Sequence, residues 1–224
     1  MYIYSFSNYT DTPIDKLSNK KAMLSKRFNR ADNFINLSLL GAQRCMQDIT
    51  IDKDSSIYIA SRNGNMNSTI KVLDAIFLQD RLPMPFNFLN SVNASTLFFI
   101  AQNFNIEGKS LSVDSFEFAL LSAFEDIKDG KTALVGAVEE VISDLNLHKQ
   151  GFNTEHIQEY SRWLLISSNI SSLKPIAKIV NIKLTRDSQP KSPLSNLFDF
   201  LDTEDNKTFN FIGKNLQFSI EKYI

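Results

Sequence analysis

Apolar residues follow two alternating patterns along this chain of 224 residues. Short runs rich in β-branched and aromatic residues predict strands at 2–6, 56–60, 111–113, 132–140 and 175–184. Apolar residues at helical spacing predict helices at 33–46, 68–77, 93–104 and 116–127. Because strands and helices alternate, the pattern predicts an α/β fold with a parallel sheet covered by helices.

The second predicted helix has a clear start and a clear end. Ser68 is expected to cap it, because a serine hydroxyl can accept from a free amide of the first turn. Its apolar stripe, expected to face the core, comprises Ile70, Leu73, Ile76 and Phe77. The prolines of RLPMP then end the helix, since proline cannot continue it.

Residues 111–140 read as a strand, a sharp turn, a buried helix and a second strand. Asp114 and Glu117 fit an aspartate variant of the capping box, in which the two side chains satisfy each other's backbone amides. Gly130 is expected just beyond the end of the helix, where glycine is favoured. The strand at 132–140 is apolar almost throughout, as in a sheet covered on both faces.

The last third of the chain is less regular. Residues 156–170 fit a single helix, residues 187–196 read as a linker rich in Ser and Pro, and residues 208–224 alternate around IGKN like a hairpin. The length suits one domain over 1–224, in which the part from 185 to 224 is a tail of uncertain role.

Composition narrows the classes of function. The 24 basic and 25 acidic side chains nearly cancel, which gives no support for nucleic-acid binding. No apolar run approaches the length of a membrane span, about 20 residues. The first residues lack the basic and leucine-rich regions of a secretory signal, so a cytoplasmic protein is expected.

Few residues offer chemistry of their own. The one cysteine, Cys45, lies on the apolar face of a predicted helix, where a buried thiol is inert. The two histidines, His148 and His156, lie in a polar stretch at a spacing that does not suit a helical metal pair. No dinucleotide fingerprint or P-loop is present, so neither a metal nor a cofactor is expected.

Two pairs of neighbouring residues with acidic or hydroxyl side chains remain as candidates for a catalytic role. Ser115, with Asp114 beside it, lies at the one turn where a nucleophile could sit, although capping of the next helix explains the serine more simply. Glu139 and Glu140 end a strand and read as a solvated loop, because no second positioned carboxylate is apparent.

Residues 16–32 form a basic segment that includes Lys26, Arg27 and Arg30. Such a segment fits either a solvated helix flank or a docking surface for an acidic partner. If the segment is a docking surface, its local positive charge would raise the rate at which the chain associates with the acidic partner.

The order of several segments resembles a known family. SRNG at 61–64, PFNFLNSVNA at 85–94 and DSFEFALLSA at 114–123 are similar to segments of the ketosynthase-like family, short homologues of β-ketoacyl synthases. These are often called chain length factors of aryl polyene and related pigment clusters. The likeness covers about residues 25–140. It departs from the family at SVNA, because the histidine that the family has between the valine and the asparagine is missing, so that Asn93 follows Val92 directly.

The resemblance implies a thiolase-like half with a mixed, mostly parallel five-stranded sheet covered by helices. It implies pairing with a catalytic ketosynthase as a heterodimer in polyketide, aryl polyene or fatty-acid-like biosynthesis. Acyl carrier protein is a further possible partner. The family's condensing enzymes carry a nucleophilic cysteine at the turn that here reads SVDSF, so the chain is expected to be a pseudoenzyme with no catalytic residue.

The same resemblance suggests roles for individual residues. Phe116, Phe118 and Asn93 are candidates for contacting the partner or shaping its acyl tunnel, and Lys26, Arg27 and Arg30 for docking a carrier protein or the partner. Two alternatives stay open at this point. One is a divergent acyltransferase or hydrolase that uses Ser115 or Asp114, and the other is a stand-alone acyl-binding module.

Overall fold

The computed structural model describes residues 1–10, 24, 30–142, 159–185, 192–203 and 207–223. Within them lies one eight-stranded sheet with the strand order β3-β2-β4-β5-β1-β6-β8-β7. The strands are β1 (Tyr2–Thr10), β2 (Ser56–Ala60), β3 (Ser110–Val113), β4 (Thr132–Glu139), β5 (Tyr160–Ser167), β6 (Ala177–Leu184), β7 (Thr208–Ile212) and β8 (Leu216–Lys222).

The expectation of a mostly parallel sheet of five strands is wrong. Only β2 pairs in parallel, with β3 on one side and β4 on the other, and the remaining five pairings are antiparallel. The α/β assignment itself is correct. Alternation of strands and helices predicts parallel pairing only where a helix crosses between neighbouring strands, which happens here among β2, β3 and β4.

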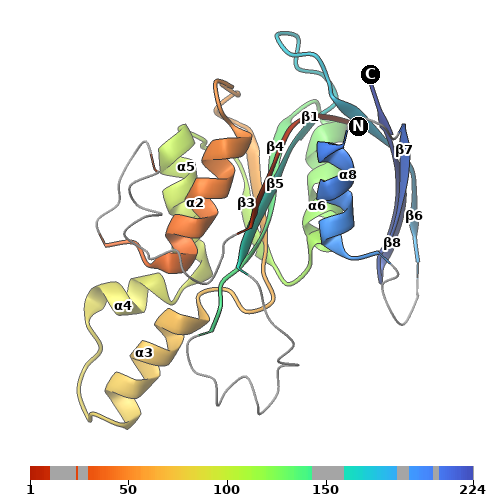
Figure 1. Ribbon diagram of the computed structural model, residues 1–224. Coiled ribbons are helices and arrows are strands. Elements are labelled where there is room, and N and C mark those ends of the chain that lie inside the picture. Colours follow the sequence, from red (N-terminus) through yellow and green to blue (C-terminus); the bar gives the residue numbers. More distant parts are fainter. Residues whose placement is uncertain (11–23, 25–29, 143–158, 186–191, 204–206, 224) are drawn as a thin grey trace.

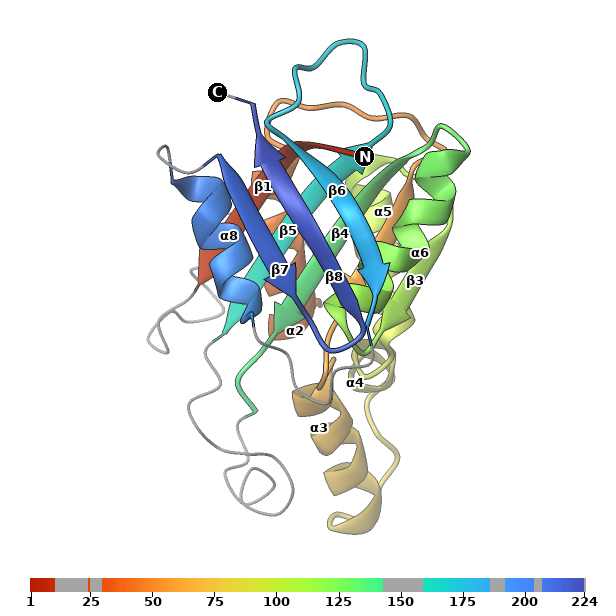
Figure 2. The same ribbon diagram turned by 90° about the vertical axis from the view of Figure 1, so that its right-hand side faces the viewer.

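Helices cover both faces of the sheet (Figure 1). α2 (Asn33–Cys45) and α5 (Asn93–Phe104) lie on one face, while α6 (Phe116–Lys128) and α8 (Leu194–Asp202) lie on the other. The end of the sheet formed by β6, β8 and β7 curls around α8 and α6, so that these two helices have strands on two sides (Figure 2). α3 (Met66–Phe77) and α4 (Pro85–Asn90) project from this body as an arm, here called the α3–α4 arm.

Each face of the sheet has its own hydrophobic core. Alternate residues of each strand point to opposite sides, so Ile57 and Ile59 join the core of α2 and α5, while Tyr58 and Ala60 join the core of α6 and α8. Trp163 fills the first of these cores and is fully buried.

Two glycines make room for the Trp163 ring. A Cβ on Gly136 would lie 2.6 Å from three ring atoms, and a Cβ on Gly41 would lie 2.7 Å from Trp163 Cδ1 and 2.2 Å from Ser161 Oγ. Both approaches are closer than carbon and oxygen atoms tolerate. The indole therefore packs directly against the backbone of β4 and α2.

The helix predicted over 156–170 is wrong for its described part, because Tyr160–Ser167 forms strand β5. β5 lies between β4 and β1 and is buried on both faces. A short continuous apolar run has no period that distinguishes a doubly covered strand from a buried helix, which explains the error. The linker predicted over 187–196 is also wrong at its end, since α8 begins at Leu194.

The apolar stripe of α3 does not face the core as expected. Leu73, Ile76 and Phe77 are 46%, 42% and 77% exposed, and the buried residues of this helix are the small ones Ser68, Val72 and Ala75. Ser68 is not the cap either. The helix begins at Met66, and the Ser68 hydroxyl donates instead to the Asp32 carboxylate at the start of α2.

Other sequence expectations are confirmed. Strand β2 and helices α2 and α5 have the predicted positions, and β7 and β8 form the hairpin predicted around IGKN. Gly130 follows the end of α6 with φ of +82°, a conformation that glycine adopts without strain. No helix within the described residues is long and apolar enough to cross a membrane.

Candidate functional site

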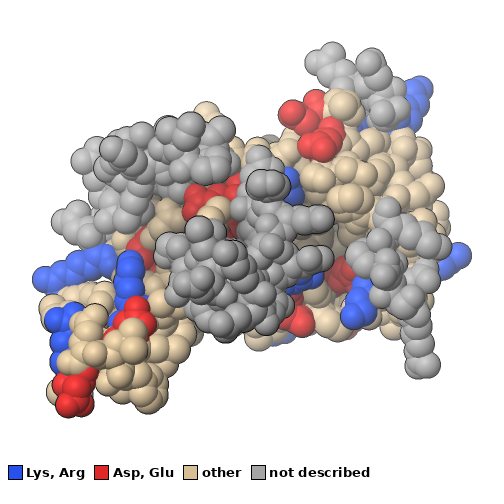
Figure 3. Space-filling view, turned by 60° about the horizontal axis from the view of Figure 1, so that its bottom comes forward, with Lys and Arg blue, Asp and Glu red and all other residues tan. Residues whose placement is uncertain are grey.

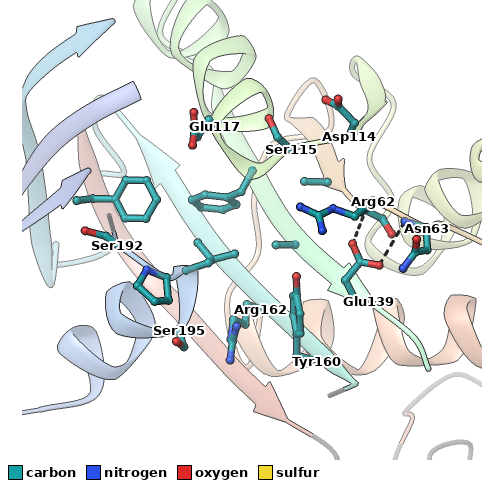
Figure 4. A pocket seen from close by; sticks show the side chains of 17 residues that line it. Arg62, Asn63, Asp114, Ser115, Glu117, Glu139, Tyr160, Arg162, Ser192 and Ser195 are labelled. Carbon is teal, nitrogen blue, oxygen red and sulfur yellow. Dashed lines mark hydrogen bonds between the residues drawn. The ribbon is translucent and has the colours of Figure 1, made fainter. Parts of the chain in front are cut away.

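A pocket of about 550 Å³ opens at the carboxyl ends of β2, β3 and β4, on the side of α6 and α8 (Figure 4). In α/β sheets, ligands generally bind at this end of parallel strands. Its walls include the first turns of α6 and α8, the loop after β2 and the tip of β7. Its charged lining residues are Arg62, Asp114, Glu117, Glu139 and Arg162.

The floor of the pocket is one row across the sheet. In the strand register Ala60 lies beside Ala137, which in turn lies beside Arg162. The two alanine side chains are too small to fill the space under the helices, so the row leaves a hollow. Arg162 ends this hollow on the β5 side, with its guanidinium carbon 4.5 Å from the centre of the Tyr160 ring.

The turn that contains Asp114 and Ser115 forms one rim of the pocket (Figure 4). Ser115 is the N-cap of α6, and its hydroxyl accepts from the Phe118 amide at 3.4 Å. This confirms the simpler interpretation of Ser115. The predicted capping box is wrong, because the exposed Asp114 lies one residue before the cap and Glu117 does not reach back to it.

Glu117 instead anchors the C-terminal hairpin. Its carboxylate accepts from the Lys214 amide at 2.7 Å and from the Asn215 amide at 2.5 Å, both in the β7–β8 turn. The approach is close enough that a Cβ on Gly213 would lie 2.2 Å from Glu117 Oε1. The first turn of α6 is therefore fastened to the hairpin by a buried carboxylate.

Glu139 and Glu140 are buried, so the expectation of a solvated loop is wrong. The Glu139 carboxylate accepts from the backbone amides of Arg62 and Asn63, the second at 3.4 Å, and fixes the loop after β2 (Figure 4). Burial raises the pKa of Glu139, although the two amides and the Arg62 charge oppose this shift. Burial, and next the charge of the Glu139 carboxylate, raise the pKa of Tyr160 to about 12.

Glu140 belongs to a separate acidic cluster at the starts of α2 and α3. Its carboxylate accepts from the Asn67 amide and from Asn33 Nδ2, both at 3.3 Å, and the Asn33 amide also donates to Glu159 at 2.7 Å. Burial, and next the charge of Asp32, raise the pKa of Glu140 to about 7. Among the described residues no group of three His, Cys, Asp or Glu side chains could hold a metal ion.

Cys45 lies on the opposite face of the sheet from the pocket. It is fully buried in the core of α2 and α5, where burial raises the pKa of its thiol to about 12. The sequence-based expectation of an inert core cysteine is confirmed. A thiol in this place can neither reach the pocket nor ionise near neutral pH.

The remaining candidates for partner contact fall into three groups. Phe116 is buried against Phe198 of α8, whereas Phe118 is 43% exposed at the outer side of α6. Asn93 begins α5 and holds the loop after β2, since its Oδ1 accepts from the Asn65 amide at 3.4 Å. In addition, a Cβ on Gly64 (φ +55°) would lie 2.5 Å from Asn93 Oδ1.

Of the basic candidates, Arg30 is described and lies over the Phe86 ring of α4, with its guanidinium carbon 3.9 Å from the ring centre. Lys26 and Arg27 lie outside the described residues, as do His148 and His156. Docking by these residues and tunnel shaping by the phenylalanines stay predictions.

Sequence reasoning missed Arg62, Tyr160 and Arg162 as residues of the site. A signal existed for Arg162, because an arginine inside the apolar run YSRWLLIS stands out in a buried strand. Assigning that run to a helix concealed the signal. The pocket can bind and orient a ligand, but its described lining contains no histidine, and no hydrogen bond joins the Ser115 hydroxyl to Asp114, Glu117 or Glu139. The Ser115 hydroxyl is therefore not activated as a nucleophile in this arrangement.

No protein-family model and no curated protein matches the sequence. Solved structures do match the fold. One is a ketosynthase in complex with its chain length factor from Xenorhabdus doucetiae, with a TM-score of 0.68 and 16% identity over 98% of this chain and 98% of that chain.

Two more matches carry related names. The ishigamide ketosynthase/chain length factor matches with a TM-score of 0.69 and 13% identity over 84% of this chain and 67% of that one. A type II polyketide synthase acyl carrier protein in complex with its ketosynthase matches with a TM-score of 0.56 and 12% identity, over 80% of this chain and 63% of that one. The fold is ketosynthase-like, of the thiolase type.

Proposed function

We propose that the chain is a non-catalytic ketosynthase-like subunit that pairs with a catalytic ketosynthase in polyketide or aryl polyene biosynthesis. The observation that carries the proposal is a fold of the condensing-enzyme type without its thiol. The turn before α6 has Ser115 as a helix cap, and Cys45 lies buried on the other face of the sheet. The solved complex from Xenorhabdus supports this reading, because its matched chain has nearly the length of this one.

A site for the partner is suggested by the edge of the sheet at β3. The Ile57 amide donates to the Lys109 carbonyl and the Ser61 amide donates to the Val113 carbonyl, so odd-numbered residues of β3 bond to β2. In a parallel ladder the alternate residues, Ser110 and Ser112, then direct their amides and carbonyls away from the sheet. An edge strand of this kind can pair with a strand of another chain.

Exposed apolar side chains flank this edge. Phe98 of α5 is 61% exposed, Leu111 of β3 is 37% exposed and Phe118 of α6 is 43% exposed, and both helices pack against β3. Exposed apolar patches beside an unpaired strand are typical of protein interfaces. This placement supports the interpretation of Phe118 as a partner contact, while the burial of Phe116 favours a core role for that residue.

The α3–α4 arm adds further apolar surface. Most of the exposed large apolar residues of the described chain belong to residues 73–92, with Phe77, Leu78 and Leu82 at 77%, 78% and 92% exposure. In Figure 3 the arm shows uncharged surface between scattered charged side chains. α4 packs against α5, which connects the arm to the β3 edge. A partner seated on both would bury side chains that are otherwise costly to expose.

The proposal is tested by co-expressing the chain with the ketosynthase encoded beside it and purifying through a tag on the ketosynthase. We expect the two chains to co-purify. Ser112→Pro should abolish this, because proline removes an outward amide of the β3 edge and leaves the bonds between β3 and β2 intact.

Thr208→Pro is the matched control. It removes an outward amide of β7 at the opposite edge of the sheet, where Lys207 and Phe209 carry the bonds to β8. The control should co-purify like the wild-type chain. Failure of the wild-type chain to bind the ketosynthase, or equal binding by the Ser112→Pro variant, would contradict the proposed pairing.

A further inference from the structure

Arg162 is a buried cation whose charge is poorly compensated within the described structure. It is only 9% exposed, and burial lowers its pKa, which means that the charged form is disfavoured where it lies. No carboxylate of the described residues forms an ion pair with it. The charge of Asp199 opposes this shift but forms no ion pair with Arg162. A buried charge without a directly bonded counter-charge is destabilising, so the position of Arg162 calls for an explanation.

The contacts that Arg162 does make are neutral. Its Nε donates to Asn8 Oδ1 at 2.9 Å, and its guanidinium lies over the Tyr160 ring. Asp199 lies behind Asn8, whose Nδ2 donates to the Asp199 carboxylate at 3.3 Å. Asp199, whose charge acts on Arg162, is thus reached only through the Asn8 amide, and no hydrogen bond to a described residue uses the two terminal nitrogens of Arg162.

Two of the three acidic side chains that line the pocket already accept hydrogen bonds from backbone amides. Glu117 accepts from the β7–β8 turn and Glu139 from the loop after β2, as described above. Asp114 is exposed at the rim. None of the three forms an ion pair with Arg162, whereas Arg62 brings a second guanidinium to the same pocket (Figure 4).

Two helix starts add positive potential to the same space. α6 begins at the Ser115 side of the pocket and α8 begins at Pro193 and Leu194, which line it from the other side. The first-turn amides of a helix favour an anion placed before them. The remainder of the lining is apolar and includes Phe116 and Phe211.

We propose that this pocket binds an amphiphilic anion, with Arg162 as the principal counter-charge of its carboxylate or phosphate group. The apolar body of the ligand would lie over Ala60 and Ala137, where small side chains leave the hollow. A cavity of about 550 Å³ is of the size that takes up small organic ligands. The proposal does not depend on pairing with a ketosynthase, because every residue involved belongs to this chain.

The test is isothermal titration of the purified chain with four probes that share an eight-carbon body: octanoate, octyl phosphate, octanol and octylamine. We expect octanoate or octyl phosphate to bind at one site per chain, and the tighter of the two identifies the anionic group. Octanol and octylamine should bind at least about tenfold more weakly, because a charged hydrogen bond is worth roughly one or two factors of ten.

Variants then locate the site. Arg162→Gln should weaken anion binding about tenfold or more, and Arg62→Gln should weaken it to a smaller extent. Arg81→Gln, at an exposed position after α3, is the matched control and should bind like the wild-type chain. Circular dichroism shows whether the Arg162→Gln variant is folded. If it is not, the comparison of octanoate with octanol on the wild-type chain still decides the question.

Three results would overturn the inference. The first is absence of binding by both anions, and the second is equal affinity for octanol and for the better anion. The third is unchanged anion affinity in folded Arg162→Gln and Arg62→Gln variants, which would place the anion elsewhere.

Discussion

Glu140 gives the sharpest prediction about stability, because its carboxylate is buried beside other acids. It is 1% exposed, it shares the Asn33 amide with Glu159, and the charge of Asp32 acts on it. Burial, and next the charge of Asp32, raise the pKa of Glu140 from 4.5 to about 7, although the hydrogen bonds from Asn67 and Asn33 oppose this shift. The folded chain therefore holds a proton on Glu140 at pH values where the unfolded chain has released it.

The sign of the pH dependence follows from linkage. Below pH 4.5 the group is protonated in both states, and its contribution to stability is fully present. As pH rises from 4.5 through 7 this contribution is lost progressively, because the unfolded chain has released a proton that the folded chain still holds; above 7 the folded state must bury the ionised carboxylate. A shift of this size corresponds to about 3 kcal/mol, since each pKa unit corresponds to about 1.36 kcal/mol.

Glu140→Gln removes the ionisation and keeps the shape. The amide oxygen can still accept from the Asn67 amide, and the new NH₂ group can donate to a neighbouring carboxylate. We expect the stability difference between the variant and the wild-type chain to be smallest at pH 5 and to grow with pH, until the variant exceeds the wild-type free energy of unfolding by up to about 3 kcal/mol at pH 8.

Urea unfolding at pH 5, 6, 7 and 8 measures this difference. Glu125→Gln, which removes an exposed carboxylate from α6, controls for the loss of one negative charge. A stability difference between the Glu140→Gln variant and the wild-type chain that stays constant from pH 5 to pH 8, after subtraction of the control, would refute the reasoning.

Three further predictions concern the thiol, the hairpin and the core. Cys45 should resist iodoacetamide at pH 8 in the native chain and react after unfolding, because burial raises its pKa to about 12; rapid native labelling would contradict its placement. Glu117→Ala should lower the free energy of unfolding by about 1–3 kcal/mol, since two partly buried hydrogen bonds from amides of the β7–β8 turn lose their acceptor; thermal unfolding measures this, and an unchanged melting temperature would argue against the anchor. Gly136→Ala should lower the free energy of unfolding by about 1–3 kcal/mol or more, because its Cβ would meet the Trp163 ring at 2.6 Å, and a red shift of the tryptophan fluorescence should accompany the change, since Trp163 is fully buried in the native chain; a variant as stable as the wild type would show that the indole can move.

The sequence predicted local elements better than their arrangement. α2, α5 and the C-terminal hairpin are recognisable because each shows one period over its length, and β2 is recognisable as a short run of β-branched and aromatic residues. β5 was not recognised, since a strand covered on both faces has no polar side to reveal a period of two. With β5 missing, the antiparallel half of the sheet could not be predicted.

The remaining wrong predictions concern which side chains are buried and which are exposed. Apolar periodicity predicts that one face of α3 is covered but does not say by what, and within this chain Leu73, Ile76 and Phe77 stay exposed. Glu139 and Glu140 show the opposite error, because they were predicted to be solvated and are buried. Their burial depends on loops that donate hydrogen bonds to them, and the local sequence does not identify those loops. The acceptor role of each carboxylate depends on amides about seventy residues or more away in the chain.

The pocket could be predicted only in part. The turn at Asp114 and Ser115 marks one rim, because strand, turn and helix follow each other in the sequence. Arg162 and the start of α8 reach the pocket through long-range pairing of β5 and β1 and through the curl of the sheet. No local pattern carries that information.

The most direct test of the proposed function is native mass spectrometry of the chain with its ketosynthase after incubation with an acyl thioester. We expect a one-to-one complex in which only the ketosynthase gains the mass of the acyl group. An acyl adduct on this chain, or a chain that stays alone at 25.5 kDa beside an acylated ketosynthase, would contradict it.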